Sequence, residues 1–257
     1  MSNDYFVRTS TAGKRDTDLA GLDVDDVFPA APLQTALHLH RLSEPSGTLA
    51  DLGSGAIAAT LVGSGWTRGA AGPYRGRKGV SQSGAGSTDA VLVSGTTIPA
   101  AGFTVGLTVV AKARVAPTLY GPFLSVTNNT ASPSLNELNV AHQNNGTIYM
   151  TMGSGSSFEG SSPGATLDWS RPHRILMDYV AATKVARLWV DGSLYVSYTH
   201  GPAAIANCTR LMALGPSLAS GHGGNNFLAA NDLQAWGRVL TANERAYDWS
   251  QVDGSRR

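Results

Sequence analysis

The sequence predicts an all-β protein: a sandwich of two antiparallel β-sheets, with one short C-terminal helix and an extended N-terminal arm. Short strand-like segments recur from Leu33 onward and are separated by turns rich in Gly, Ser and Asn, a spacing typical of sandwiches and barrels. The run VARLWVDGSLYVSYTH centres two such segments on Asp191-Gly192, which indicates a hairpin because a type I′ turn needs positive φ at both central residues. With 257 residues, 42% of them hydrophobic, the chain is long enough to bury a sizeable core.

Residues 1–32 differ from the rest of the chain. They contain six acidic and three basic residues, which gives a net charge of −3, and their few apolar residues show no period. Such a segment cannot bury enough apolar surface to fold alone. We therefore divide the chain into an arm, 1–32, and a folded domain, 33–257. We expect the arm to make an assembly contact by running across a neighbouring subunit; the alternative is that it lies along the domain's own surface.

The expected strands lie in seven stretches of the folded domain. In the stretch 103–115 every second residue from Phe103 to Val115 is apolar, which predicts one face in the core. Trp189 lies in the middle of another strand, and we predict that it also faces the core. GSGSSFEGSSPG and SLASGHGGNNF are low in complexity and are predicted to be loops. The seven stretches are ALHLHRL, FTVGLTVVAKARV, LYGPFLSV, NELNVAHQNNGTIYMTM, HRILMDYVAATKVARLWVDGSLYVSY, TRLMALG and NNFLAANDLQAWGRV.

One helix is predicted, in TANERAYDWSQV near the end of the chain. Thr241 and Glu244 have the spacing of a capping box, in which each side chain accepts a hydrogen bond from the other residue's backbone N–H. The helix is therefore expected to begin directly after Thr241.

Composition excludes several classes of function. The net charge is +1, so bulk electrostatics gives no reason to expect nucleic acid or an anionic membrane as a partner. No run of about eighteen apolar residues exists to span a membrane, and the first residues lack the pattern of a cleaved secretory signal. Cys208 is the only cysteine, which leaves no intrachain disulfide and no cysteine-built zinc site. Its setting, NCTRLMALG, predicts a buried thiol.

The order of five segments along the chain is characteristic. LHRLSEPSGTLADLGSGAIAATLVGSG leads from an Arg-Leu-x-Glu strand through Ser-Gly-Thr and Ala-Asp to a Gly-rich end, and STDAVLV, FTVGLTVVAKARV, VARLWVDGSLYVS and NDLQAWGRVLTANE follow. Over roughly residues 33–250, this order resembles the laminin-G-like jelly-roll domains of the concanavalin A-like lectin/glucanase superfamily. The resemblance implies a jelly roll of two packed antiparallel sheets with about six or seven strands each.

The resemblance also implies a structural calcium site. Many members of the family hold calcium between the N-terminal acidic strand and an Asp of the last strand, and the matching residues here are Glu44 and Asp232. This chain departs from the family pattern in having His40 for an aromatic residue and Ser43 for an acid. Calcium takes six to eight oxygen ligands, so two carboxylates suffice only with several backbone carbonyls. The alternative is two polar residues at sheet edges, and we expect no cofactor to be required.

The candidate catalytic and metal-binding residues are few. Some jelly rolls of this superfamily are glycoside hydrolases, and retaining hydrolysis needs two carboxylates about 5–5.5 Å apart. On a strand these would appear as alternating acids, yet in NELNVAHQ Glu137 is followed by Asn139 and Ala141. We therefore predict that the protein is not an enzyme. His38 and His40 share one side of a strand and could begin a metal site, but the sequence shows no third ligand.

The expected setting is a virus particle. Laminin-G-like modules act mostly outside cells, and a virion protein, assembled in the host cytoplasm and released by lysis, needs no export signal. The 15 arginines against four lysines indicate a GC-rich genome and so a bacterial host or its phage. We predict a non-enzymatic structural protein of a bacteriophage particle, either a head decoration or cement protein or a tail-associated surface protein. Its partners would be other virion proteins and copies of itself.

A cell-surface glycan is a further expected partner. The segment SGHGGNNF places His222, Asn225 and Asn226 in a loop, where amide and imidazole groups can hydrogen-bond to sugar hydroxyls. The alternative is a plain turn-rich connection. For the whole protein, one alternative is a bacterial glycan-binding module exported without a cleaved signal, and another is a divergent glycosidase.

Overall fold

A computed structural model describes most of the folded domain. The described residues are 36–71, 78–82, 90–111, 121–128, 138–143, 145–153, 158–161, 164–201, 205–215 and 228–254. The arm at 1–32 and the loop residues His222, Asn225 and Asn226 lie outside these ranges. The assembly contact of the arm and the glycan site of the loop therefore stay predictions.

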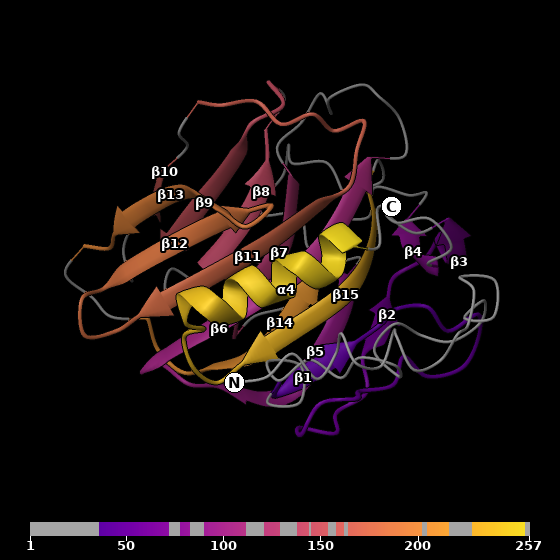
Figure 1. The fold of residues 1–257 in the computed structure, drawn as a ribbon. Coiled ribbons are helices and arrows are strands. Elements are labelled where there is room, and N and C mark those ends of the chain that lie inside the picture. The colour runs from indigo at the N-terminus through magenta and orange to yellow at the C-terminus, as the bar shows by residue number, and fades with distance from the viewer. Residues whose placement is uncertain are drawn as a thin grey trace, which may run out of the picture.

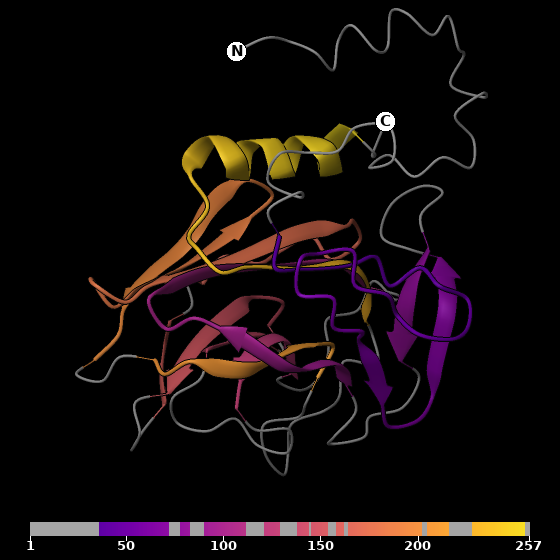
Figure 2. The ribbon, with the colours of Figure 1, turned by 90° about the horizontal axis from the view of Figure 1, so that it is seen from below.

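Two antiparallel sheets lie face to face and form the body of the molecule (Figure 1, Figure 2). This arrangement confirms the predicted β-sandwich. The first sheet has eight strands, in spatial order β13 (Ser193–Thr199), β12 (Val185–Val190), β11 (His173–Val180), β6 (Gly102–Ala111), β15 (Leu228–Trp236), β4 (Lys78–Gln82) and β3 (Trp66–Ala71), with β1 (His38–His40) also paired to β15. The second sheet has seven strands, in the order β10 (Phe158–Ser161), β9 (Ile148–Gly153), β8 (Leu138–His142), β7 (Gly121–Thr127), β14 (Cys208–Ala213), β5 (Ala90–Ile98) and β2 (Thr60–Val62).

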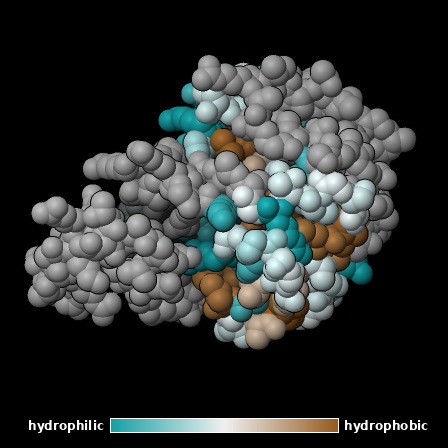
Figure 3. Space-filling view, turned by 90° about the vertical axis from the view of Figure 1, so that its right-hand side faces the viewer, coloured by the Kyte–Doolittle hydropathy of each residue, from teal (hydrophilic) through white to brown (hydrophobic). Residues whose placement is uncertain are grey.

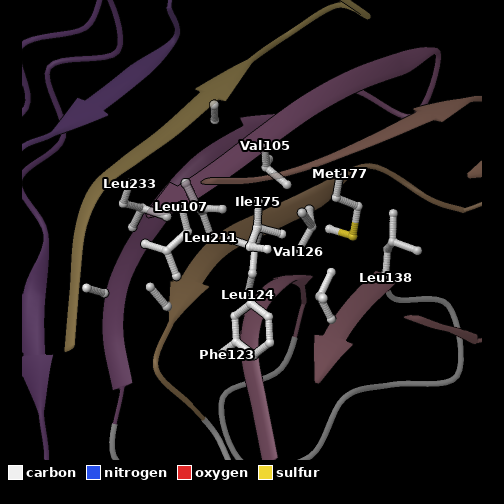
Figure 4. Close-up of a cluster of buried hydrophobic side chains, with 14 of the residues drawn as sticks. Val105, Leu107, Phe123, Leu124, Val126, Leu138, Ile175, Met177, Leu211 and Leu233 are labelled. Carbon is white, nitrogen blue, oxygen red and sulfur yellow. The ribbon is translucent and has the colours of Figure 1, made fainter. Parts of the chain in front are cut away.

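The hydrophobic core fills the space between the two sheets. Val105 and Leu107 of β6 point inward, as their alternation predicts, and they face Leu124 and Val126 of β7 in the opposite sheet (Figure 4). Burying an aliphatic side chain of this size contributes about 1.5–3 kcal/mol to stability. Cys208 is fully buried in the same cluster, which confirms the prediction of a buried thiol.

The hairpin between β12 and β13 turns on Asp191-Gly192 as predicted. Asp191 has φ 52° and Gly192 has φ 79°, the positive pair that a type I′ turn requires. The Asp191 carboxylate also accepts hydrogen bonds from the Arg174 backbone N–H and from His173 Nδ1, each at 2.9 Å. A Cβ atom at Gly192 would lie 2.9 Å from the Trp249 ring, so glycine is needed here for close packing as well as for the turn.

The helix α4 (Ala242–Gly254) lies across the outer face of the eight-stranded sheet (Figure 1, Figure 2). It begins with the predicted capping box: Glu244 Oε2 accepts the Thr241 N–H at 2.8 Å, and Thr241 Oγ1 accepts the Glu244 N–H at 3.3 Å. Among the described residues, no helix is long and apolar enough to cross a membrane.

Trp189 does not face the core, and our prediction for it is wrong. In β12 it is Ala186, Leu188 and Val190 that pack into the space between the sheets. Trp189 points to the outer face, where the Arg245 guanidinium carbon of α4 lies 4.0 Å from its ring centroid. Both alternating faces of β12 carry apolar residues, so alternation alone could not tell which face was inside.

One expected loop contains a strand. Within GSGSSFEGSSPG, β10 (Phe158–Ser161) pairs with β9 in antiparallel register. The Gly- and Ser-rich composition predicted a loop, but an edge strand needs partners on one side only, so the neighbouring strand can impose pairing on a sequence of low β propensity.

Candidate functional site

The polar side chains on the outer faces of the two sheets differ in their hydrogen bonding. On the eight-stranded sheet, Arg174 of β11 is buried under α4, and its Nε and Nη2 atoms donate to the two carboxylate oxygens of Asp248 at 2.9 and 3.0 Å. The same guanidinium donates to the Asp232 carbonyl at 3.0 Å and to the Gln234 side chain. Bidentate pairing of this kind satisfies both charges, so the helix and sheet are joined by a closed polar network.

A second set of contacts on this face surrounds Asp178, which is fully buried. Its carboxylate accepts hydrogen bonds from Arg187 Nε at 2.7 Å and from Trp189 Nε1 at 2.8 Å. Each of these buried acids therefore has an arginine partner within the chain, and the contacts are those of a structural network.

On the outer face of the seven-stranded sheet, three polar side chains form a row across neighbouring strands. Ser125 of β7 pairs in register with Asn139 of β8, and Asn139 pairs with Thr151 of β9. The exposed fractions of the three residues are 1%, 1% and 4%. Yet Ser125 Oγ, Asn139 Nδ2 and Thr151 Oγ1 have no hydrogen-bond partner. We call these three residues the polar row.

The polar row is unusual because buried polar atoms in folded proteins are nearly all hydrogen-bonded. A single unpaired group costs about 1–3 kcal/mol, and here three lie next to one another. Sequence reasoning examined Asn139 only as a failed catalytic acid. The available signal was a polar residue at an outward position in each of three consecutive, largely apolar strands.

Histidines of the first strand form a second candidate site. One ligand atom each from His38, His40 and Asp51 lies within 4.8 Å of the other two, so the structure supplies the third ligand that the sequence did not show. His38 Nδ1 lies 2.7 Å from Asp51 Oδ2, and His38 Nε2 lies 2.5 Å from Thr96 Oγ1. Asp51 lies in a loop, eleven residues after His40 in the sequence, and no sequence pattern predicts that the two residues are close in space.

The Asp51 carboxylate is held by the loop that surrounds it. Oδ1 accepts the N–H groups of Leu39 and Gly53, at 2.9 and 2.8 Å, and Oδ2 accepts the N–H of Ile57 at 2.9 Å. Burial would raise the pKa of this carboxyl, but these hydrogen bonds and the one from His38 together hold the pKa below its usual value. Asp51 is therefore an anion in a fixed position.

His40 is the histidine with a spare nitrogen. Its Nδ1 lies 3.0 Å from the Ala50 carbonyl, which can only accept, so Nδ1 carries the proton. Its Nε2 is buried and has no hydrogen-bond partner. Burial lowers the pKa of His40 and outweighs the opposing effect of the Asp51 carboxylate, so the imidazole is neutral with a free lone pair.

The candidate calcium ligands are placed as follows. Asp232 is buried in β15 and its Oδ1 accepts from Arg41 Nη1 at 3.0 Å. Glu44 is partly exposed and its Oε1 accepts the Ala50 N–H at 3.0 Å. Arg41 already gives Asp232 the positive charge that a calcium ion would bring, and a calcium site at these residues stays a prediction.

Comparisons with known proteins identify the fold. No family model and no curated protein matches the sequence. Solved structures do match: Trypanosoma rangeli sialidase in complex with sialic acid, at TM-score 0.62 and 13% identity, is covered over 33% of its length by 84% of this chain. The botulinum neurotoxin type G receptor binding domain, at TM-score 0.59 and 14% identity, is covered over 51% of its length by 84% of this chain. The chain thus spans a third to a half of these structures.

At these identities the comparisons show an antiparallel β-sandwich fold and nothing finer. They are consistent with a jelly roll, while the assignment to laminin-G-like domains and to a phage particle is left as a proposal. They also correct our expectation that the protein is not an enzyme, because the sandwich is shared with sialidases, which are enzymes. The missing strand of alternating acids therefore no longer excludes catalysis.

Proposed function

We propose that this chain is a glycan-binding jelly roll and that the polar row contributes to its binding site. The observation that carries the proposal is the set of three neighbouring unpaired polar atoms on Ser125, Asn139 and Thr151. Two hydroxyls and an amide offer both donors and acceptors, the groups that recognise the hydroxyls of a sugar. The polar row is buried. A ligand can therefore contact it only after the atoms that shield it from solvent have moved aside.

The names of the structural neighbours support this class of ligand. One neighbour is a sialidase in complex with sialic acid. Ser125, Asn139 and Thr151 carry no charge, and their groups suit hydrogen bonds to the hydroxyls of a sugar. The loop residues His222, Asn225 and Asn226 are a second proposed contact region for the same ligand.

A glycan array probed with the purified protein tests the proposal. Ser125→Ala and Asn139→Ala are expected to weaken binding of the preferred glycan by about tenfold each, the loss of roughly one hydrogen bond of about 1.4 kcal/mol. Ser193→Ala, at an exposed serine of β13, is the matched control and should leave binding unchanged. A triple alanine variant at His222, Asn225 and Asn226 separates the loop from the polar row. Binding that survives both Ser125→Ala and Asn139→Ala would remove the polar row from the site.

The proposed setting is the surface of a bacteriophage particle, as head decoration or cement or as a tail-associated protein. The support comes from composition: an acidic arm at 1–32, the excess of arginine over lysine, and a lone cysteine that is buried. Other virion proteins and copies of this chain would be the partners. Deletion of residues 1–30 is expected to leave the domain folded and to abolish incorporation into particles. A truncated protein that unfolds, or that still assembles, would contradict this setting, and recovery from bacterial culture medium without particles would favour the exported module.

Hydrolysis is a second candidate function, because the structural neighbours include sialidases. The described buried acids Asp178, Asp232 and Asp248 each lie within 3.0 Å of an arginine nitrogen, so an active pair of carboxylates would have to come from elsewhere in the chain. Release of free sugar from a panel of sialylated and neutral polysaccharides is the direct assay.

A further inference from the structure

We propose that His38, His40 and Asp51 bind a divalent transition-metal ion of the zinc class. One ligand atom from each residue lies within 4.8 Å of the other two, and the three side chains come from β1 and the loop that follows it. Two imidazoles and a carboxylate are ligands that zinc commonly takes. The proposal is independent of glycan binding, since the polar row and this cluster share no residue.

His40 has the arrangement of a metal-ligating histidine. Such histidines almost always donate their second ring N–H to a carbonyl or carboxylate, which fixes the tautomer and leaves the other nitrogen for the metal. Here the Ala50 carbonyl lies 3.0 Å from Nδ1, and Nε2 is buried without a partner. A buried ring nitrogen left unpaired costs stability, and a metal ion would satisfy it.

His38 can bind the same ion through a small change. Its Nδ1 faces Asp51 Oδ2 at 2.7 Å, whereas two ligands of a tetrahedral zinc ion, at bond lengths near 2.1 Å, lie roughly 3.3 Å apart. A metal between these atoms therefore needs an opening of several tenths of an ångström. In the tautomer that frees Nδ1 for the ion, the ring proton is on Nε2, and Nε2–H donates a hydrogen bond to Thr96 Oγ1 at 2.5 Å.

The loop between Asp51 and Ile57 packs tightly against β1 and the His38 ring. A Cβ atom at Gly55 would lie 2.4 Å from His38 Cε1, and one at Gly53 would lie 2.7 Å from the Leu37 carbonyl. Only glycine allows the backbone to approach the ring this closely. Together with the three backbone N–H groups on Asp51, this packing presents the carboxylate in a fixed orientation.

The donor set selects the metal. Calcium and magnesium prefer oxygen ligands, whereas imidazole suits zinc and its neighbours among the transition metals. His38 and His40 are fully buried, which is typical of a structural ion. β1 belongs to the eight-stranded sheet and Thr96 to β5 of the seven-stranded sheet, so the His38–Thr96 hydrogen bond links the two sheets beside the proposed ion.

Metal titration of the full chain, first stripped with a chelator, tests the site. Cobalt is the spectroscopic probe, and we expect one ion per chain, the strong visible absorption of a four-coordinate site, and displacement by zinc. Thermal unfolding with zinc should show a rise in Tm that calcium does not produce. Absence of stoichiometric binding in the wild-type chain would overturn the proposal whatever the variants do.

Four variants locate the ion. His40→Gln and His38→Gln should lower cobalt and zinc affinity by more than about 100-fold, and Thr96→Val, which removes the partner of a ligand, by about 10–100-fold. His173→Gln is the matched control: His173 Nδ1 also lies 2.9 Å from a carboxylate, that of Asp191, but the pair belongs to no described three-ligand cluster. Circular dichroism and the metal-free Tm show which variants fold. Unchanged affinity in folded His40→Gln, or a loss in His173→Gln equal to that in His40→Gln, would place the ion elsewhere.

Discussion

Buried polar side chains lie on the outer faces of both sheets, but they differ in whether they have hydrogen-bond partners. On the eight-stranded sheet, α4 covers the face, and both carboxylate oxygens of Asp178 and of Asp248 accept hydrogen bonds, from Arg174, Arg187 and Trp189. On the seven-stranded sheet, the polar row of Ser125, Asn139 and Thr151 is just as buried but unpaired. No described element plays the part of α4 there (Figure 2).

The difference separates polar groups that serve the fold from polar groups that await a partner. A buried polar network stabilises a unique structure only when its members are satisfied. The carboxylates of Asp178 and Asp248 under α4 meet this condition, although Asn231 Oδ1 on the same sheet has no partner. Unsatisfied groups lower stability, and the proposed glycan would satisfy those of the polar row. On the described part of the surface at the end of the sandwich near β3 and β4, apolar side chains form separate groups among polar ones (Figure 3).

The largest effect is expected from breaking the paired face. Arg174→Met leaves the Asp248 carboxylate buried without its partner, which should cost about 3–5 kcal/mol of unfolding free energy. Urea denaturation measures the loss. The double variant Arg174→Met with Asp248→Leu should recover much of it, because removing both charges ends the desolvation penalty. Equal losses in the single and double variants would show that the pair is not what joins helix and sheet.

Trp189→Ala tests how much the packing of α4 against the sheet depends on this side chain. The ring is partly buried and packs against the outer cluster containing Leu176 and Trp236, so the loss should be about 2 kcal/mol, below the 3–5 kcal/mol of a fully buried aromatic residue. Its removal also takes a hydrogen bond from Asp178. A far smaller loss, in the range of surface substitutions, would mean that the helix does not depend on this contact.

Glu244→Gln tests the start of the covering helix and has a defined pH dependence. Hydrogen bonds from Arg238 at 2.8 and 2.6 Å hold the pKa of Glu244 at about 2, below its ordinary 4.5. A lowered pKa means that this stabilisation is complete above pH 4.5 and is lost as the pH falls toward 2. The pair lies at the surface, so the cost at neutral pH should be below about 1 kcal/mol. Parallel stability curves for the two proteins from pH 5 to pH 2 would contradict the assignment.

The fold was predictable because its signals are local. The Asp191-Gly192 turn, the capping box at Thr241 and the alternation in β6 all depend on residues within a few positions of one another, and the structure confirms each. Trp189 shows the limit: apolar residues lie on both faces of β12, and the packing of the two sheets decides which face is inside. β10 shows another, since its pairing comes from β9 and not from its own composition.

The candidate sites were less predictable because they join distant parts of the chain. Asn139 and Thr151 become neighbours of Ser125 only through strand register, and Asp51 reaches His38 through a loop whose glycines allow close approach. The i, i+2 pair His38 and His40 was visible in the sequence, but its third ligand was not. Spacing along one strand can be read locally, whereas contacts between strands require the topology.

The central claim is that the buried acids under α4 are paired within the chain whereas the polar row awaits a ligand, and one substitution made on both faces tests it most directly. Thr104→Val on the helix-covered face removes the oxygen that accepts the Leu240 N–H at 3.0 Å, whereas Thr151→Val removes an unpaired hydroxyl from the polar row. In urea denaturation of the ligand-free protein, we expect Thr104→Val to lower the unfolding free energy by about 1–3 kcal/mol and Thr151→Val to raise it by about 1 kcal/mol. A loss of stability in both variants would show that the polar row is already satisfied, for example by buried water, and would contradict the claim.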